Sequence, residues 1–491
     1  MIITIEVPKE LRQIVPVMCG AGIAVSFGMM LGWASVAYPT LLQEATSPIP
    51  LNIEITPLIA GFLWEGNTLG CLFSTSKYLP SKLAVCLCFC LQIVGWILMY
   101  FSQNIFWFLA SRASVGFAHG YGMGQLKRYI KETCDPSVAA GINNYMPTGM
   151  ALGVLMMFTL GANVDFRSMA IYSTIIPILG LITFGAIPKA VKEEESGGSG
   201  GDGNRINNVM SVQDKNDLTK NMTPVATHVK PLGVFDVIKD PESRHCLLIM
   251  FLLVFLQQYG GGAANIVYSQ IILVSTHNPN PKVGSIVYAF CFLVSMTLSL
   301  KFAKKFSRKF NLVTTLGCCI FILSLIALYF FLRHDLEELN PIFRWAPLFL
   351  LVLYNFFHTF GLATVPLLML SEMMPKYSVN IGSKFWTIHF SMSAVISTKI
   401  FQIIYTAYGM SMAYIFFVLV LIVGFLIMLV VKDFTPDENS KPSTIPPRLE
   451  TVESAPPQPQ LQQLQQQQTP VAIVSQGQVN QAFEISENTR F

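Results

Sequence analysis

The chain has 491 residues, of which 52% are hydrophobic and only 12% are charged, and its net charge is +4. Soluble domains carry about 25% charged residues, so this composition excludes a soluble globular protein and indicates a polytopic membrane protein that lies in the lipid bilayer. We expect no nucleic-acid partner for such a protein. The ten cysteines lie almost all in apolar stretches without metal-ligand spacing, which predicts that they pack as small hydrophobic residues.

Twelve apolar segments recur along the chain, and each is long enough to cross a bilayer as a helix. They form two groups of six, which predicts an all-α fold with two six-helix halves, residues 13–188 and 244–431. Outside the halves lie the N-terminus (1–12), a polar linker (189–243) that ends in a predicted short surface helix (231–245), and a Pro- and Gln-rich tail (432–491) expected to be disordered. The spans are expected near residues 13–38, 55–76, 83–102, 106–127, 138–161, 168–188, 244–274, 283–303, 312–332, 345–371, 379–406 and 411–431.

Basic residues in the short loops predict the orientation, because cytoplasmic loops are enriched in Lys and Arg. The loops after spans 2, 4, 8 and 10 hold most of them, whereas the loops after spans 1, 3 and 11 hold none. Both termini and the linker are therefore predicted to be cytoplasmic. The basic residues of the predicted cytoplasmic loops are Lys77, Lys82, Lys127, Arg128, Lys131, Lys304, Lys305, Arg308, Lys309 and Lys376.

Gln257 and Gln258 lie side by side in the apolar segment 247–269, which also contains three consecutive glycines. Lipid offers a buried amide no hydrogen-bond partner, so each amide costs a few kcal/mol unless it lines a cavity. Irregular polar segments at membrane depth are typical of substrate paths in transporters. The sequence therefore predicts a transporter for a small solute.

Several short motifs follow one another along the chain: Arg112–Gly116, Glu132, Phe306–Lys309, Ser371–Pro375, Thr398–Phe401 and Thr435–Glu438. In this order they resemble motifs of the sugar-porter branch of the major facilitator superfamily, and most closely those of its insect facilitated trehalose transporters. The resemblance covers about residues 10–440. It implies two six-helix halves, a site between them at mid-membrane, and alternating-access transport of a sugar such as trehalose or a hexose.

The resemblance also implies a cytoplasmic gate. Arg112, placed on the cytoplasmic half of span 4, together with Arg308, is expected to bind the carboxylates of Glu132 and Glu372 when the protein faces outward. Arginine suits this role because its planar, permanently charged guanidinium binds carboxylates with two hydrogen bonds. The alternative is that these are solvated loop charges that follow the positive-inside rule.

The chain departs from the family at several expected sugar ligands. An expected asparagine in span 7 is Ala263, with Asn265 two residues later, and Leu367 stands where the family has a tryptophan. Three readings stay open: a less polar solute, a non-transporting sensor-like relative, or a sugar held by a rearranged site. That rearranged site would consist of Asn143, Asn144, Gln257, Gln258, Asn265 and Tyr268.

Glu65 in span 2 and Lys399 in span 11 both lie about 10–15 Å below the outer surface at 1.5 Å per residue. They could form an ion pair between the halves, or Glu65 could carry a proton; alternatively Glu65 faces water and Lys399 reaches outward. Uniport is favoured, since span 1 has no coupling acid. The sequence contains no catalytic set, so we expect neither an enzyme nor a cofactor, and protein partners stay unknown. The plasma membrane is the expected location.

Overall fold

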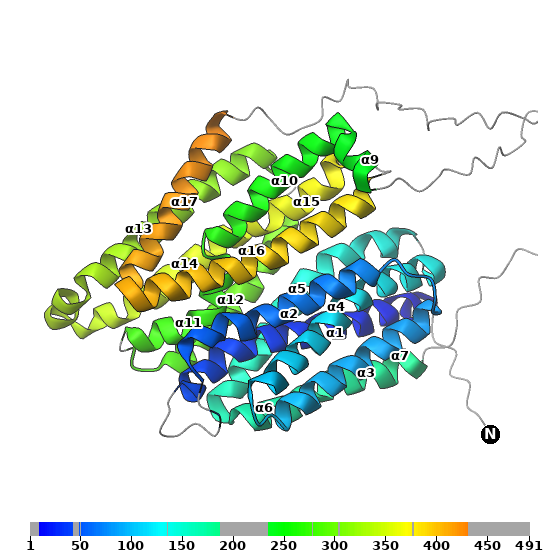
Figure 1. The fold of residues 1–491 in the computed structure, drawn as a ribbon, viewed down its shortest axis with the longest axis horizontal. Coiled ribbons are helices and arrows are strands. Elements are labelled where there is room, and N and C mark those ends of the chain that lie inside the picture. Colours follow the sequence, from blue (N-terminus) through cyan, green and yellow to red (C-terminus); the bar gives the residue numbers. More distant parts are fainter. Residues whose placement is uncertain are drawn as a thin grey trace, which may run out of the picture. The chain divides into compact units, whose positions relative to one another are not determined.

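Figure 1 shows the chain as a computed structural model, in which residues 9–42, 49, 51–134, 136–186, 234–276, 278–302, 305–375 and 378–430 are described. The described residues form helices and short connections, as predicted for an all-α protein. The predicted linker and tail lie largely outside the described residues. One described helix, α9, falls inside the segment 231–245 that was predicted to contain a short helix.

The N-terminal helices account for the first six predicted spans, and we call this set the N-terminal half. The sixth span is divided into α6 and α7 at Thr174, because Pro177 cannot donate a hydrogen bond to the carbonyl of Ser173. The elements are α1 (Lys9–Leu41), η1 (Ile53–Ile55), α2 (Thr56–Phe73), α3 (Ser81–Tyr100), α4 (Ile105–Thr133), α5 (Pro136–Asn163), α6 (Phe166–Ser173) and α7 (Ile175–Ala186).

The helices that follow the linker account for the other six spans, and we call α10–α17 the C-terminal half. The seventh span is broken at Gly260–Gly261, and the tenth contains a π-turn, η3, just before Pro366. The elements are α9 (Val234–Lys239), α10 (Pro241–Tyr259), α11 (Gly262–Ser275), α12 (Pro281–Phe302), α13 (Arg308–Leu339), η2 (Pro341–Trp345), α14 (Ala346–His358), η3 (Thr359–Ala363), α15 (Thr364–Met373), α16 (Val379–Tyr408) and α17 (Met410–Val430).

Within the described residues, ten helical segments are long and apolar enough to cross a membrane. The helices α2 and α4, which were also predicted to span, are less apolar. Glu65 and Asn67 lower the hydropathy of α2, and Arg112 and His119 lower that of α4. These polar residues are largely covered by neighbouring helices, so low hydropathy is compatible with a position inside a helical bundle.

Glycines allow α2 and α4 to approach each other closely. A Cβ atom on Gly116 would lie 2.1 Å from the carbonyl oxygen of Leu63, and one on Gly120 would lie 2.1 Å from that of Asn67. Both contacts are with backbone atoms that cannot move aside. Small residues at helix crossings are the usual means by which membrane helices pack.

The two halves meet along α2 and α16, along α5 and α12, and along α1 and α11. We call the end of these helices that holds Lys384, Glu132 and α9 the linker end. The opposite end, which holds Thr56, Lys282 and Lys399, is the distal end. At the linker end, Lys384 Nζ donates to the carbonyl of Leu72 at 3.3 Å.

Candidate functional site

The break between α10 and α11 forms the centre of the candidate site. Gly261 has a φ of 99°, which lies in the left-handed region that glycine adopts without strain. The break frees backbone carbonyls, and side chains of other helices bind them. His358 Nε2 donates to the carbonyl of Gln257 at 3.1 Å, Ser397 Oγ to that of Gln258 at 2.7 Å, and the Tyr354 hydroxyl to that of Gly260 at 2.7 Å.

Gln257 and Gln258 are both buried at this break, with 7% and 3% of their surface exposed. Neither side-chain oxygen has a hydrogen-bond partner among the described residues. Buried polar atoms in proteins are almost always hydrogen-bonded, so two orphaned amide oxygens side by side are unusual. These oxygens are available to accept hydrogen bonds from a solute.

Two buried asparagines offer hydrogen-bond donors, which complement the glutamine oxygens. One lies on α11, and the other lies on α14 between Tyr354 and His358, which both bind the break. Asn265 is buried on α11; its Oδ1 accepts a hydrogen bond from the Tyr414 hydroxyl at 3.0 Å, but its Nδ2 has no partner among the described residues. The Nδ2 of buried Asn355 on α14 is likewise orphaned. Sequence reasoning did not single out Asn355, although an asparagine three residues before His358 in an apolar span was the available signal.

Tyr268 belongs to a barrier between the halves rather than to this set of orphaned amides. Its hydroxyl lies 3.0 Å from Thr56 Oγ1 of α2, and the next residue, Ser269, lies 2.8 Å from Ser35 of α1 through their hydroxyl oxygens. The Tyr38 hydroxyl donates to the carbonyl of Thr56 at 2.7 Å. We call these five residues the distal barrier, since they join the halves on the distal side of Asn265.

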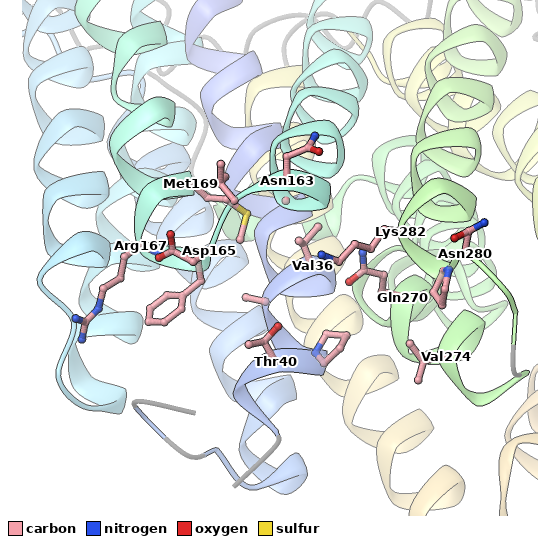
Figure 2. Close-up of a pocket in the computed structure, with 16 residues that line it drawn as sticks. Val36, Thr40, Asn163, Asp165, Arg167, Met169, Gln270, Val274, Asn280 and Lys282 are labelled. Carbon is pink, nitrogen blue, oxygen red and sulfur yellow. The ribbon is translucent and has the colours of Figure 1, made fainter. Parts of the chain in front are cut away.

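A cavity of about 830 Å³ lies at the distal end beside the barrier, and Figure 2 shows side chains that line it. It lies between α1, α5 and α6 of the N-terminal half and α11 and α12 of the C-terminal half. Polar side chains such as Asp165, Gln270 and Lys282 line it. None of the predicted substrate ligands lines this cavity, so it is a vestibule outside the barrier rather than the predicted site.

Asn143 and Asn144 lie in α5, but their side chains are outside the described residues. In the N-terminal half, aromatic side chains of α1 and α2 face α16. Phe27 contacts Trp64 at 5.4 Å between ring centroids, and Trp64 contacts Phe390 of α16 at 5.1 Å. Of the predicted substrate ligands, the structure thus places Gln257, Gln258 and Asn265 together.

The predicted gate residues do not form one cluster. Arg308 on α13 binds Glu372 on α15 with two hydrogen bonds, of 3.0 and 2.6 Å, entirely within the C-terminal half. Glu132 is bound by Arg128 at 2.8 Å and by Ser81 at 2.5 Å, entirely within the N-terminal half. Both carboxylates lie at the linker end, and a gating role for these ion pairs stays a prediction.

The prediction for Arg112 was wrong. Arg112 lies in the second turn of α4, whereas Glu132 lies at the other end of the same helix. Twenty residues of α-helix at 1.5 Å each separate the two by about 30 Å. Arg112 is therefore in the distal half of α4, and its guanidinium lies 5.8 Å from the centre of the Trp33 ring.

One of the alternatives for Glu65 and Lys399, an ion pair between the halves, was also wrong. Both residues lie in the described part of the chain, and no ion pair joins them. Lys399 Nζ instead donates to the carbonyl of Glu54 at 3.0 Å and to Gln402 Oε1 at 2.8 Å. The long lysine side chain therefore reaches toward the distal end, which was the alternative expectation.

Comparisons with known proteins identify the family of the chain. The profile of the family described as "Sugar (and other) transporter" matches residues 54–435. A facilitated trehalose transporter of Polypedilum vanderplanki is 25% identical over 86% of this chain and 85% of its own length, and one of Culex quinquefasciatus is 23% identical over 86% and 83%.

The fold resembles solved transporters. The structure of a D-xylose–proton symporter superposes with a TM-score of 0.64 at 13% identity, covering 87% of this chain and 98% of that one. An inward-open structure of the Escherichia coli xylose transporter XylE gives a TM-score of 0.62 at 13% identity, covering 88% and 97%. This likeness confirms the predicted major facilitator fold. The chain is a multi-pass membrane protein that belongs to the sugar transporter family.

Proposed function

We propose that this protein carries a neutral, hydroxyl-rich solute, a trehalose- or hexose-like sugar, across the plasma membrane by alternating access. The names of its relatives refer to trehalose and xylose, and both are sugars. The solute binds at the α10–α11 break, where hydrogen bonds to the protein replace its hydrogen bonds to water. Both termini lie in the cytoplasm, in agreement with the basic residues of the linker-end loops.

The observation that carries this proposal is the mixture of orphaned atoms around the break. Gln257 and Gln258 offer oxygens that accept hydrogen bonds, whereas Asn265 and Asn355 offer N–H groups that donate them. A sugar hydroxyl both donates and accepts, so it can satisfy both kinds of atom at once. A site built to hydrogen-bond hydroxyls discriminates strongly against solutes that lack them.

We infer facilitated transport without proton coupling. Beyond Glu10 the helix α1 contains no carboxylate, and Glu65 of α2 has no ion-pair partner among the described residues. If Glu65 does carry a proton, uptake depends on pH and Glu65→Gln removes that dependence. A comparison of uptake at pH 5.5 and 7.5 in both proteins therefore decides between the mechanisms.

The first test is uptake of labelled trehalose and glucose by cells that express the full chain. We expect saturable uptake in the wild type and a loss of about fivefold or more in Gln257→Ala/Gln258→Ala, because two buried hydrogen bonds contribute about 0.5–1.5 kcal/mol each. Gln103→Ala is the matched control, since Gln103 is an exposed glutamine in the loop after α3. No uptake by wild-type protein at the cell surface would refute a sugar substrate.

Asn355 gives a second and independent test of the site. Asn355→Leu removes the orphaned donor but keeps a side chain of similar size, so kcat/KM for the sugar should fall about 3- to 10-fold. The variant should keep the thermal stability of the wild type, because the Asn355 amide nitrogen has no protein partner to lose. Unchanged uptake would remove Asn355 from the site.

A further inference from the structure

The guanidinium of Arg112 is fully buried in the N-terminal half. The residue has 0% of its surface exposed, and Nε, Nη1 and Nη2 all lack a hydrogen-bond partner among the described residues. Arginine stays protonated in proteins, so this is a permanent positive charge inside the bundle. A buried charge of this kind normally has a counter-charge or a full set of hydrogen bonds.

The indole N–H of Trp33 is also buried without a hydrogen-bond acceptor among the described residues. Trp33 is also 0% exposed, its Nε1 has no partner among the described residues, and the Arg112 guanidinium lies over its ring. The two residues come from different helices, α1 and α4. Together they place four donor nitrogens without an acceptor in one buried region.

The neighbouring residues offer no negative charge to these donors. Phe108 and Phe166 pack on Trp33, at 5.3 and 6.5 Å between ring centroids. The hydroxyl of Tyr38 donates its proton to the carbonyl of Thr56, so it brings no negative charge to Arg112. No carboxylate among the described residues forms a salt bridge with Arg112.

We propose that Arg112 and Trp33 form a binding site for a small inorganic anion of chloride size. Donors without acceptors are the chemistry of an anion site, in contrast to the mixed donors and acceptors at the α10–α11 break. The anion supplies the missing counter-charge and accepts hydrogen bonds from both side chains. Complete burial and aromatic walls favour a compact halide over a carboxylate carried by a larger solute.

The site can be tested on the purified full-length protein in detergent by thermal unfolding at constant ionic strength. We expect the Tm of the wild type to rise by several degrees as sodium chloride replaces sodium gluconate, since a ligand that binds the folded state stabilises it. Bromide should act similarly. An equal Tm in chloride and gluconate, or a rise with sodium formate but not with chloride, would overturn the halide site.

Variants separate this site from general effects of salt. Arg112→Met should lose the chloride response, and in gluconate it should melt no lower than the wild type, because it removes an uncompensated charge. Arg308→Met is the matched control: its guanidinium already binds Glu372, so its chloride response should remain. A chloride response retained by Arg112→Met would refute the proposal.

Trp33→Phe keeps the charge of Arg112 and the aromatic packing but removes the indole N–H donor. This variant tests the site even if Arg112→Met does not fold. Binding of radioactive chloride, measured directly, should be about tenfold weaker in this variant than in the wild type. Equal chloride affinity in the two proteins would exclude Trp33 from the site. These readouts do not use sugar uptake, so they stand apart from the proposed transport activity.

Discussion

Single side chains in this protein are best understood through the partners that they have or lack. Gln257, Gln258 and Asn355 are buried, and one side-chain amide atom of each has no hydrogen-bond partner among the described residues. The hydroxyls of Tyr354 and Tyr414, in contrast, donate hydrogen bonds. A polar atom buried without a partner costs about 1–3 kcal/mol. Around the α10–α11 break, a polar solute would remove this cost by supplying the missing hydrogen-bond partners.

Glu132 gives a prediction about pH at the residue scale. Partial burial raises its pKa, but hydrogen bonds from Ser81 and Arg128 and the charge of Arg128 outweigh this effect, so its pKa lies below the usual value. A depressed pKa in the folded state stabilises the protein above the pKa of the unfolded state. This stability is lost as the pH falls from about 5 through the lowered pKa.

Glu132→Gln should therefore lower the Tm at pH 7 and have a smaller effect at pH 4. The Glu132 side chain is 46% exposed, so solvent screening limits the difference to below about 1 kcal/mol. Thermal unfolding of both proteins at the two pH values measures it. The same gap between them at pH 4 and pH 7 would show that the carboxylate charge does not matter.

Helix packing is determined by small residues at crossings. The α2–α4 contact depends on glycines of both helices: a Cβ on Gly66 would lie 2.4 Å from the carbonyl oxygen of Ala113, just as one on Gly116 would meet Leu63. This contact fixes the depth of α4 relative to α2. It therefore also fixes where the buried Arg112 lies.

Gly116→Ala should lower the free energy of unfolding by several kcal/mol, because the added methyl group meets backbone that cannot move without separating the helices. Gly185→Ala is the matched control, since nothing lies within 4 Å of its Cβ position. Thermal unfolding of the two variants in detergent measures the difference. Equal Tm values would show that α2 and α4 tolerate a wider separation than the structure has.

The sequence predicted elements better than it predicted pairs of side chains. Hydropathy located the long helices, of which ten in the described part of the chain are apolar enough to cross a membrane. The run of three glycines at 260–262 indicated irregular backbone where α10 ends. Arg112 was assigned to the wrong end of its helix because the motif, rather than the number of residues from the helix start, guided its placement. The Glu65–Lys399 pair failed because a flexible lysine can reach the backbone carbonyl of Glu54, and no sequence pattern encodes that carbonyl.

At the scale of the whole molecule, the distal barrier and the linker end make different contacts between the halves. Hydroxyl groups of Ser35, Thr56, Tyr268 and Ser269 join the halves at the barrier. At the linker end, Lys384 donates to the carbonyl of Leu72 in the last turn of α2 and to the hydroxyl of Thr75, and the C-terminus of a helix is a favourable position for a cation. Alternating access requires the barrier contacts to break while other contacts form.

Thr56→Val should weaken the closed barrier while keeping the shape of the side chain. The Tyr268 hydroxyl then loses its partner, and about 1 kcal/mol corresponds to a roughly fivefold shift toward the distally open state. Spin labels at Gln103 and Asn280, in a background without native cysteines, would report this as a larger population at long distance. An unchanged distance distribution would mean that the Thr56 hydroxyl does not hold the barrier.

The broken helix has a consequence for how this fold diversifies. Its freed carbonyls accept hydrogen bonds from His358, Ser397 and Tyr354, which belong to α14 and α16. The side chains of Gln257 and Gln258 do not hold them. The backbone of the break therefore does not depend on which side chains perform recognition. Substrate selectivity can therefore change in evolution, or be redesigned, by single substitutions at residues such as Gln258 or Asn355, while the backbone conformation of the break stays the same.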